Sequence, residues 1–551
     1  MRLMRWFGSL AGVGVWVGVA VLLGASGAGL KAEDRCRDLK GAKVGVAEIG
    51  LPTSGAVVKS VGSVGGAGGG YCRVYGEIGP VDRAAQPIRF ALNLPATWNG
   101  KAVQFGGGAF DGYLKQSDGR GRGVVGVLGA ATPLERGYAT FGSDAGHHHH
   151  YLLLPDALNA VHAEFALNVE QRRNFAQDSL KKTHDVAVAL IRMHYGRATQ
   201  RMYFLGGSTG GREALKVVQN WPQDYDGVLA AYAAWDQIES DLQFIRVSQA
   251  LYAQGDRAER GWLPTSKTKL VLRESMAACD AQDGLRDGMI SDVAGCHFEP
   301  EKLMCADGKD HRGCLSKGQL RTVETYATAQ VSDYAMVHGM RLMPGYNVLA
   351  GANLRDNRGL LRRPMHRPFV FLNSFQLLGG DGVLRYFLTR DKAFDALKFD
   401  VKTGGKWRDG ILEQSLEDDA SDADLTVFER RGGKLLLVHG TADATIPTNS
   451  SVAYYQRVVK EMGQARADGF MRLYLLPGFA HGYGTFNAGF DGLGVLDSWA
   501  EKRIAPAGLV MRDGNKASKG RTRPMCEWPL WAKYRGSGDV TNAGSFVCVD
   551  R

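Results

Sequence analysis

The sequence contains no internal repeat and no long run of basic residues. Lys and Arg exceed Asp and Glu by ten over 551 residues, and basic clusters such as Arg362-Arg363 and residues 519–523 are short. A nucleic-acid interface needs a long basic face with aromatic readers, so we predict no nucleic-acid partner. Low-complexity sequence is confined to residues 62–70, whose glycines predict a flexible loop.

The overall composition is that of an ordinary soluble globular protein. Hydrophobic residues make up 44% of the chain and charged residues 23%, which are usual values for such proteins. A chain of 551 residues is too long for one compact core. We therefore predict a main domain with a large insertion.

The N-terminus carries a predicted signal peptide. Arg2 and Arg5 precede an apolar stretch at residues 10–24, and the small residues 25–28 follow it. The alternative is an uncleaved membrane anchor, but the apolar stretch is short and rich in glycine for a span. No cysteine follows closely enough to indicate a lipoprotein. We predict that residues 1–32 are removed, that the protein is secreted or periplasmic, and that no membrane contact remains after cleavage.

Eight cysteines are expected to form disulfides after export. Sequence alone allows roughly a hundred pairings of eight cysteines. The alternative is eight buried free thiols, which would require a reducing compartment. The cysteines are Cys36, Cys72, Cys279, Cys296, Cys305, Cys314, Cys526 and Cys548.

Ser208 lies in a G-x-S-x-G pattern between an apolar run at residues 202–205 and a helix-like run at residues 213–220. Between a strand and a helix this pattern forms a nucleophile elbow. Gly206 and Gly210 remove the Cβ atoms that would collide in so tight a turn. The alternative is a glycine-rich turn without chemistry, and the pentapeptide alone does not decide between the two.

An acid and a histidine each follow a later predicted strand. Asp443 comes after the apolar run at residues 434–440, and His481 comes after residues 472–476. The order Ser, Asp, His is that of α/β-hydrolases, and ligands bind at the carboxyl ends of parallel strands. We therefore predict a catalytic triad of Ser208, His481 and Asp443. Further strands are predicted at residues 88–94, 101–104, 138–143 and 226–231, and a helix at residues 173–194.

Other motifs accompany the predicted triad along nearly the whole mature chain. They are residues 106–112, 143–147, 195–196, 208–212, 221–227 and 499–501. With these motifs the chain resembles the tannase and feruloyl esterase family, whose bacterial members include mono(2-hydroxyethyl) terephthalate hydrolase. The resemblance implies an α/β fold, namely an α/β-hydrolase sheet flanked by helices. The core strand pattern breaks after residue 234 and resumes at residue 434. We therefore predict a catalytic domain at residues 33–234 and 429–551 and an inserted lid at residues 235–428, because an insertion between two sheet strands lies where the catalytic loops are.

The chain departs from the family beside the triad. Family members have a bridged cysteine pair just before the serine and just after the histidine, and here Gly207 and Gly482 stand there. No unpaired thiol is left, because both cysteines are missing together. For the remaining cysteines the resemblance implies sequential bridges. These are Cys36 with Cys72, Cys279 with Cys296, Cys305 with Cys314, and Cys526 with Cys548.

The lid contains an acidic loop at residues 279–290. Three closely spaced carboxylates with two glycines suit a hard cation, and calcium takes six to eight oxygen ligands. The family resemblance implies side-chain ligands Asp280, Asp283 and Asp287 and backbone oxygens of Leu285 and Met289. The alternative is an acidic turn tied by Cys279 and Cys296. We predict a structural Ca²⁺, because the loop is far in sequence from the triad.

The predicted chemistry is a two-step acyl transfer that needs no cofactor. His481 takes the proton of Ser208, and Asp443 orients His481. The N–H of Thr209 and that of Gly107 or Gly108 would hold the oxyanion. The resemblance implies a small aromatic ester as substrate. The alternatives are a serine hydrolase of another substrate class and a non-catalytic binding protein with a hydrolase fold.

Two further features are secondary. His147–His150 point in divergent directions, so we predict a solvated turn rather than a zinc site. The lid holds several aromatic residues, of which one or two are expected to line a substrate pocket. They include Phe371, Phe375, Tyr386, Phe387 and Trp407.

Overall fold

The computed structural model describes residues 34–66, 69–114, 117, 131–148, 162–355, 359–365, 372–518 and 520–550. The predicted signal peptide, His149, His150, Phe371 and Lys519 lie outside these ranges. No helix in the described ranges is both long and apolar enough to cross a membrane.

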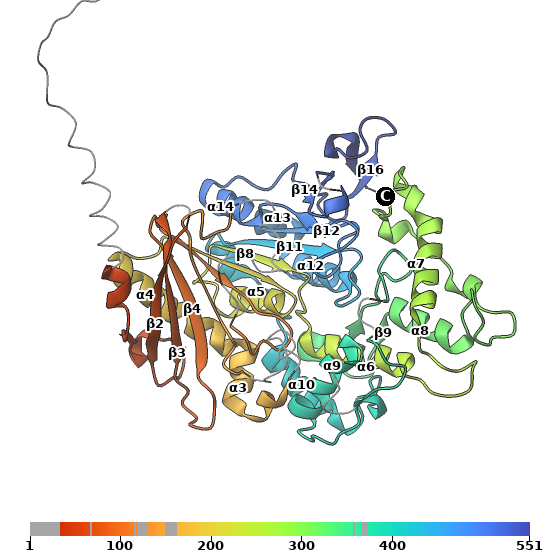
Figure 1. Ribbon diagram of the computed structural model, residues 1–551, viewed down its shortest axis with the longest axis horizontal. Coiled ribbons are helices and arrows are strands. Elements are labelled where there is room, and N and C mark those ends of the chain that lie inside the picture. Colours follow the sequence, from red (N-terminus) through yellow and green to blue (C-terminus); the bar gives the residue numbers. More distant parts are fainter. Residues whose placement is uncertain are drawn as a thin grey trace, which may run out of the picture.

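A ten-stranded mixed sheet forms the centre of the molecule (Figure 1). An antiparallel meander, β1 to β4, occupies one side, and β4 also pairs antiparallel with β6. Every neighbouring pair between β6 and β12, in the spatial order given next, is parallel. In spatial order the strands are β1 (Lys43–Val44), β2 (Ala56–Val64), β3 (Tyr71–Ile78), β4 (Ile88–Pro95), β6 (Ala139–Ser143), β5 (Lys101–Phe105), β7 (Arg201–Gly207), β8 (Gly227–Ala231), β11 (Lys434–Gly440) and β12 (Met471–Leu476).

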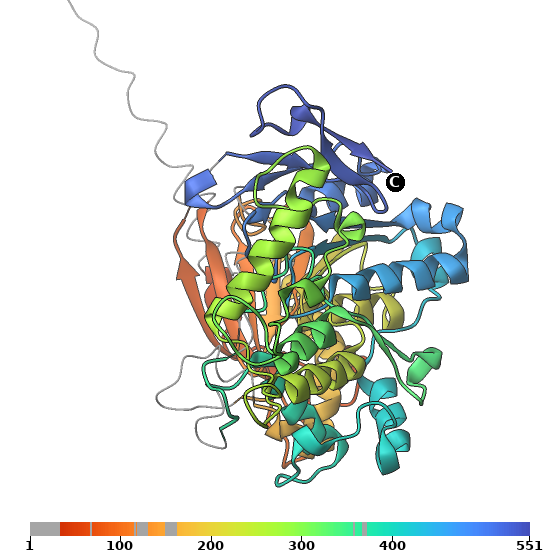
Figure 2. The ribbon, with the colours of Figure 1, turned by 90° about the vertical axis from the view of Figure 1, so that its right-hand side faces the viewer.

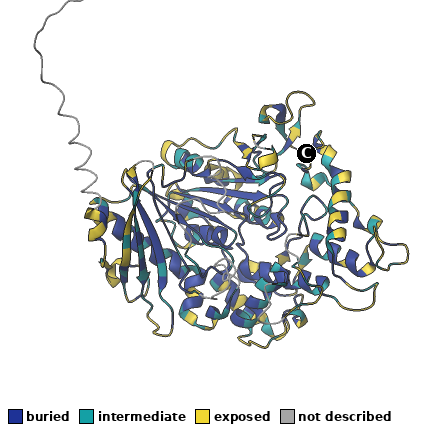
Figure 3. Ribbon diagram, in the orientation of Figure 1, coloured by how far each residue is buried: buried dark blue, intermediate teal, exposed yellow. Residues whose placement is uncertain are grey.

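The parallel strands are apolar on both faces because helices cover both sides of the sheet. Phe204 and Val228 face one core, together with α4 (Ser179–Tyr195), α5 (Thr209–Asn220) and α12 (Thr448–Met462). Leu205 and Leu229 face a second core, together with α14 (Gly492–Lys502). Figure 3 shows these strands as the most continuously buried part of the chain. The predicted α/β fold, a sheet flanked by helices, is confirmed.

The helix predicted at residues 173–194 is part of a longer helical segment. It begins with α3 (Val169–Arg173), passes through a π-turn at Asn174–Asp178 and continues as α4. The segment ends at Gly196, whose φ of +70° gives the left-handed cap that favours glycine. Leu180 and Ile191 of the predicted apolar face are buried under the sheet.

The insertion lies between β8 and β11, and its predicted limits at residues 235 and 428 fall outside both strands. Figures 1 and 2 show it in green and teal beside and below the parallel strands. Its main elements are α6 (Gln237–Leu251), α7 (Thr265–Cys279), α8 (Lys317–Ala327), β9 (Gln330–Val331), β10 (Leu342–Met343), α9 (Phe375–Gly382), α10 (Arg408–Asp418) and α11 (Thr426–Arg430).

The last part of the chain packs on the edge of the main domain near the insertion (Figure 1). After α13 (Gln464–Phe470) and β12, a three-stranded sheet and a final hairpin follow. Their strands are β13 (Ala488–Gly489), β14 (Val510–Asp513), β15 (Thr522–Pro524), β16 (Trp531–Tyr534) and β17 (Phe546–Val549).

Four disulfides cross-link the chain, and no described cysteine is free. The bridges are Cys36–Cys72, Cys279–Cys296, Cys305–Cys314 and Cys526–Cys548. These are the sequential pairs that the family resemblance implies. Two of them lie within the insertion, and one ties the C-terminal hairpin to the segment that precedes it.

One local prediction is wrong in part. Residues 62–70 were expected to be a flexible loop, but Gly62 and Val64 belong to β2 and pair with β3. Backbone pairing across the meander outweighs the low strand preference of glycine here.

Five carboxyl groups are buried where the insertion meets the main domain. Asp236, Glu239 and Asp241 lie at the start of α6, and Asp418 and Asp419 lie at the end of α10. Burial raises the pKa of Asp236 and Asp418 to about 6 and that of Asp241 to about 7. It raises the pKa of Glu239 and Asp419 well above the usual range.

These carboxyl groups predict that the protein is less stable at about pH 8 than at about pH 5. In the unfolded chain they ionise near pH 4, so between pH 4 and 7 the folded state binds more protons. Their contribution to stability is therefore lost as the pH rises through the folded pKa values. Melting temperatures at constant ionic strength measure this, and a melting temperature that rises steadily to pH 8 would contradict it. Asp419→Asn should reduce the slope.

Candidate active site

Ser208 lies at the turn between β7 and α5 with φ 63° and ψ −126°. A non-glycine residue rarely adopts a positive φ, and the strain is typical of a functional turn. A Cβ on Gly206 would lie 2.0 Å from the carbonyl oxygen of Gly210, and a Cβ on Gly210 would lie 2.9 Å from that of Gly107. The two motif glycines are therefore required by close backbone contacts, and the turn has the elbow geometry that the motif predicts.

The structure brings the three predicted triad residues together at the carboxyl ends of β7, β11 and β12. Nε2 of His481 is 2.9 Å from Oγ of Ser208, and Nδ1 is 2.7 Å from Oδ2 of Asp443. Asp443 is fully buried, and the His481 side chain is 19% exposed. The imidazole therefore lies between a buried carboxylate and a hydroxyl group at the pocket surface.

The surroundings of Asp443 keep its carboxylate ionised. Burial alone would raise the pKa, but the neighbouring His481 and His439 hold it well below its usual range. The backbone N–H groups of Thr445 and Ile446 also donate to Oδ1, at 2.7 and 3.1 Å. An ionised, fixed carboxylate orients the histidine and stabilises its protonated form.

Two residues beside the triad were missed in the sequence. His439 is fully buried, with Nε2 3.4 Å from Oδ2 of Asp443 and Nδ1 2.8 Å from Oγ of Ser451. The ring of Tyr232, a residue with φ 35°, lies 4.6 Å from that of His481 between centroids. His439 stands four residues before Asp443 at the end of the same strand, and that spacing could have marked it. His439 thus contacts Asp443, and Tyr232 contacts His481.

The expected second oxyanion donor is not available from either glycine. The N–H of Gly107 donates to Oε2 of Glu213 at 2.7 Å, and the N–H of Gly108 donates to Oδ1 of Asp111 at 2.9 Å. The glycine loop folds back onto α5, so buried carboxylates take both donors. The N–H of Thr209 is the first of α5 and has no partner within the helix. Of the predicted oxyanion donors, only the N–H of Thr209 therefore remains available to an oxyanion.

A narrow pocket opens beside Ser208, and main domain and insertion both line it. Phe244 of α6 and Phe375 of α9 form aromatic walls of this pocket. Phe375 is one of the aromatic residues of the insertion from which we expected a pocket residue. The complete lining is Ala109, Phe110, Ser208, Thr209, Ala234, Gln237, Ser240, Asp241, Phe244, Phe375, Gly379, Thr445 and Ile446. The insertion therefore forms part of the pocket wall beside Ser208.

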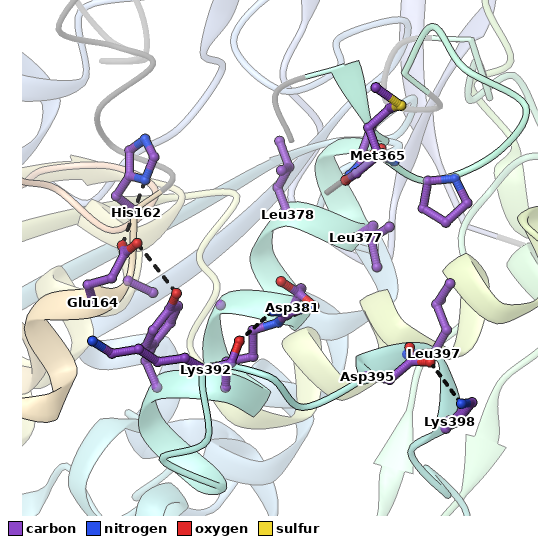
Figure 4. A pocket seen from close by; sticks show the side chains of 16 residues that line it. His162, Glu164, Met365, Leu377, Leu378, Asp381, Lys392, Asp395, Leu397 and Lys398 are labelled. Atoms are coloured by element: carbon purple, nitrogen blue, oxygen red, sulfur yellow. Dashed lines mark hydrogen bonds and ion pairs between the residues drawn. The ribbon is translucent and has the colours of Figure 1, made fainter. Parts of the chain in front are cut away.

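A larger cavity of about 650 Å³ lies on the other side of α9 (Figure 4). Charged residues line it, including Asp381, Lys392 and Asp395, and none of the triad does. A Cβ on Gly382 would lie 2.9 Å from the Phe110 ring, so α9 and Phe110 meet closely between the two spaces.

His147 is not part of a solvated turn as predicted, and His149 and His150 of the same cluster lie outside the described residues. His147 is 1% exposed and stacks on Phe165 with 3.6 Å between ring centroids. Its Nε2 lies 2.6 Å from the carbonyl oxygen of Phe110. Packing under the loop that borders the pocket outweighs hydration of the imidazole.

The predicted calcium loop folds around its own carboxylates. Oδ1 of Asp280 accepts hydrogen bonds from the N–H groups of Gly288 and Met289, both at 3.1 Å. Oδ1 of Asp283 accepts one from Leu285 at 3.1 Å. No described residue donates to the carbonyl oxygens of Leu285 and Met289. Carboxylate and free carbonyl oxygens are the donor set that Ca²⁺ prefers.

The charges in this loop are incompletely balanced. Arg523 pairs with Oδ2 of Asp287 at 2.5 Å, while Oδ1 of Asp287 is buried without a hydrogen-bond partner. Burial and the nearby Asp287 and Asp280 raise the pKa of Asp283 to about 6. The residues present therefore fit a bound divalent cation, with Arg523 as a permanent positive neighbour.

The loop lies against the segment that carries His481, although the two are far apart in sequence. A Cβ on Gly478 would lie 2.8 Å from Cγ of Met289, and one on Gly288 would lie 3.7 Å from Cγ2 of Thr485. The loop, although far from the triad in sequence, is therefore close in space to the segment that carries His481.

The comparisons with known proteins agree in one family. The family model described as tannase and feruloyl esterase matches residues 72–549. The chain is 35% identical over 529 residues to an uncharacterized esterase of Agrobacterium fabrum, covering 94% of this chain and 93% of the relative. It is 30% identical over 525 residues to the mono(2-hydroxyethyl) terephthalate hydrolase of Piscinibacter sakaiensis, covering 87% and 85%.

The fold is also that of a solved fungal structure. Feruloyl esterase B from Aspergillus oryzae superposes with a TM-score of 0.74 at 24% identity, covering 94% of this chain and 100% of that structure.

The missing cysteine pair can be tested by restoring it. Gly207→Cys with Gly482→Cys should form a disulfide under oxidising conditions, because these residues flank a serine and a histidine in direct contact. The long enclosed loop allows a gain of about 4 kcal/mol. The φ of +85° at Gly482 strains a cysteine there and offsets part of the gain.

Thiol titration and melting curves of the oxidised and reduced double variant measure both effects, with each single variant as the control. Two free thiols after oxidation would mean that positions 207 and 482 are not within the bridging range of about 4.4–6.8 Å between Cα atoms.

Proposed function

The chain belongs to the tannase and feruloyl esterase family and is a carboxylic ester hydrolase, and we propose that it cleaves esters of phenolic or other aromatic acids through an acyl-enzyme on Ser208. The observation that carries the proposal is the hydrogen-bonded series from Ser208 through His481 to Asp443, at 2.9 and 2.7 Å. This series of hydrogen bonds begins at Ser208, which lies in the strained turn beside the pocket.

In the first step His481 takes the proton of Ser208, and Oγ attacks the ester carbonyl carbon. The carbonyl oxygen gains the negative charge and accepts a hydrogen bond from the N–H of Thr209. His481 then gives its proton to the leaving alcohol as the tetrahedral intermediate collapses to the acyl-enzyme. In the second step a water attacks the acyl carbon with the same base, and the acid and free Ser208 are released.

The aromatic acyl group is supported by the pocket walls and by the relatives. Phe244 and Phe375 face the space beside Ser208, and aromatic rings pack favourably on aromatic side chains. The similar proteins include a mono(2-hydroxyethyl) terephthalate hydrolase and a probable feruloyl esterase, and both names refer to esters of aromatic acids. The four disulfides support the proposed secreted or periplasmic location.

Calcium is the second part of the proposal. Asp280, Asp283 and Asp287, with the carbonyl oxygens of Leu285 and Met289, would hold a structural Ca²⁺. The bound ion would neutralise the carboxylates and stiffen the loop, and the loop would in turn support the His481 segment through its contacts with Gly478 and Thr485.

The serine assignment is tested with Ser208→Ala. Turnover of aromatic methyl esters should fall by about 10⁴-fold or more, with an unchanged melting temperature, because only one hydroxyl group is removed. Ser498→Ala on α14 is the matched control. Near-normal turnover by purified Ser208→Ala protein would refute the assignment.

The reaction class and substrate are tested on the unmodified enzyme. A burst of p-nitrophenol from a p-nitrophenyl ester identifies an acyl-enzyme, and its absence together with tight ester binding would indicate a binding protein. Methyl gallate, methyl ferulate and a terephthalate monoester then separate the candidate substrates.

Calcium is tested by chelation and by Asp283→Asn. Both should lower the melting temperature by several degrees, since an ion at about 100 times its Kd contributes about 2.7 kcal/mol. Ester turnover should fall in parallel, because the loop contacts the His481 segment. Asp307→Asn, an exposed acid elsewhere in the insertion, is the control. If calorimetry shows no heat of calcium binding and EDTA leaves the melting temperature unchanged, the calcium proposal is refuted and the loop is an acidic turn.

A further inference from the structure

A cavity of about 420 Å³ lies between α12, the β9–β10 hairpin of the insertion and the start of α6. It shares no described lining residue with the pocket beside Ser208. Its volume falls in the range of about 300–1,000 Å³ that is typical of small-molecule sites. The lining residues are Trp235, Asp236, Val331, Gly339, Met340, Arg341, Leu342, Pro344, Ala453, Gln456, Arg457 and Lys460.

Three cationic side chains line this cavity without acidic partners. Arg341, Arg457 and Lys460 form no ion pair within the part of the chain that the structure describes. Nε of Arg457 is buried without a hydrogen-bond partner, and Nη2 of the same residue is 3.5 and 3.4 Å from the carbonyl oxygens of His338 and Ser421. Such distances exceed the usual range of about 2.7–3.2 Å. A buried donor left without an acceptor is unfavourable, so an anion in the cavity would satisfy it.

Two buried acids near the cavity do not supply the missing negative charge. Asp236 lines the cavity, but its carboxyl oxygens accept hydrogen bonds from Oγ of Ser240 and Oγ of Ser450, at 2.8 and 3.0 Å. Glu239 interacts electrostatically with Arg457, but burial raises the pKa of Glu239 well above its usual range and keeps it protonated. The three cations therefore exceed the single acid in the lining.

The rest of the wall is mostly apolar. Trp235 and Met340 are buried, whereas Val331 of β9 and Leu342 of β10 are 59% and 47% exposed. Val331 and Leu342 are direct partners in the hairpin, so their side chains lie on the same face of it. A ring packed against this pair would remove apolar surface from water.

We propose that this cavity is a second ligand site, which binds a small carboxylate with an aromatic body. The guanidinium group of Arg457 offers the parallel N–H donors that a carboxylate accepts, and the apolar wall receives the ring. The site contains no triad residue, so the inference does not rest on the proposed function. The proposed reaction releases acids of this chemical class, and its product is therefore a ligand that the site would bind.

The test measures carboxylate binding while the pocket beside Ser208 is blocked. Phenylmethanesulfonyl fluoride is used to modify Ser208, and loss of the p-nitrophenol burst verifies the modification. Isothermal titration of treated and untreated protein with benzoate should both show an occupied site. Methyl benzoate, which lacks the charge, and inorganic phosphate, which lacks the ring, should each bind to the treated protein about tenfold or more weakly.

Arg457→Gln should weaken benzoate binding to the treated protein about tenfold or more, because a charge-assisted pair of hydrogen bonds is lost. Arg312→Gln, which changes an exposed arginine elsewhere in the insertion, is the matched control and should leave benzoate binding unchanged. If Arg457→Gln does not fold, Arg341→Gln combined with Lys460→Gln replaces it, because both of these side chains are exposed.

The outcomes separate this site from the esterase mechanism. Absence of benzoate binding to the treated protein would overturn the proposal, and so would binding that the cavity variants leave unchanged. Equal weakening by Arg312→Gln would reveal unspecific attraction of anions, and phosphate binding as tight as that of benzoate would exclude an aromatic ligand. Absence of a burst from untreated enzyme would refute the mechanism at Ser208, while titration of the cavity variants would still decide on the second site.

Discussion

The active site depends on close backbone contact between the turn after β7 and the glycine loop after β5. Gly210 packs against Gly106 and Gly107 at distances that leave no room for a Cβ. This contact lets Ser208 keep a positive φ, because the surrounding backbone overdetermines the turn. Glu213, one turn further along α5, fixes the loop by accepting the N–H of Gly107. The same packing that positions Ser208 therefore also occupies the N–H of Gly107.

The histidine side of the triad is held by segments from three parts of the chain. His481 follows β12, while Met289 of the insertion packs against Gly478. From the C-terminal region, Arg521 donates to the carbonyl oxygen of Thr485. No disulfide lies next to the triad, so these packing contacts and the acidic loop hold the His481 segment in place. This arrangement makes the geometry of the base depend on the folding of the insertion.

The insertion also supplies part of the wall of the pocket beside Ser208. α6 contributes the polar pair Asp241 and Gln237, and α9 contributes Phe375 and the small Gly379. Gly379 permits the close approach of Oδ1 of Asp241 to α9. The triad thus belongs to the main domain, while main domain and insertion together form the wall of the pocket beside it.

The sequence by itself determined the sheet strands, the order of the triad and the elbow, because apolar runs and glycine spacing are local properties of the chain. The strand after Gly227 and the helix after Ser208 follow from hydrophobic pattern alone. Tertiary structure decided which partners the loops meet. The carboxylates of Glu213 and Asp111 accept hydrogen bonds from the N–H groups of Gly107 and Gly108. His147 is buried, and His439 lies beside Asp443. Some of these contacts join residues that are far apart in sequence, and others depend on the backbone conformation of a turn. Both kinds form only when the sheet, the insertion and the C-terminal strands pack together.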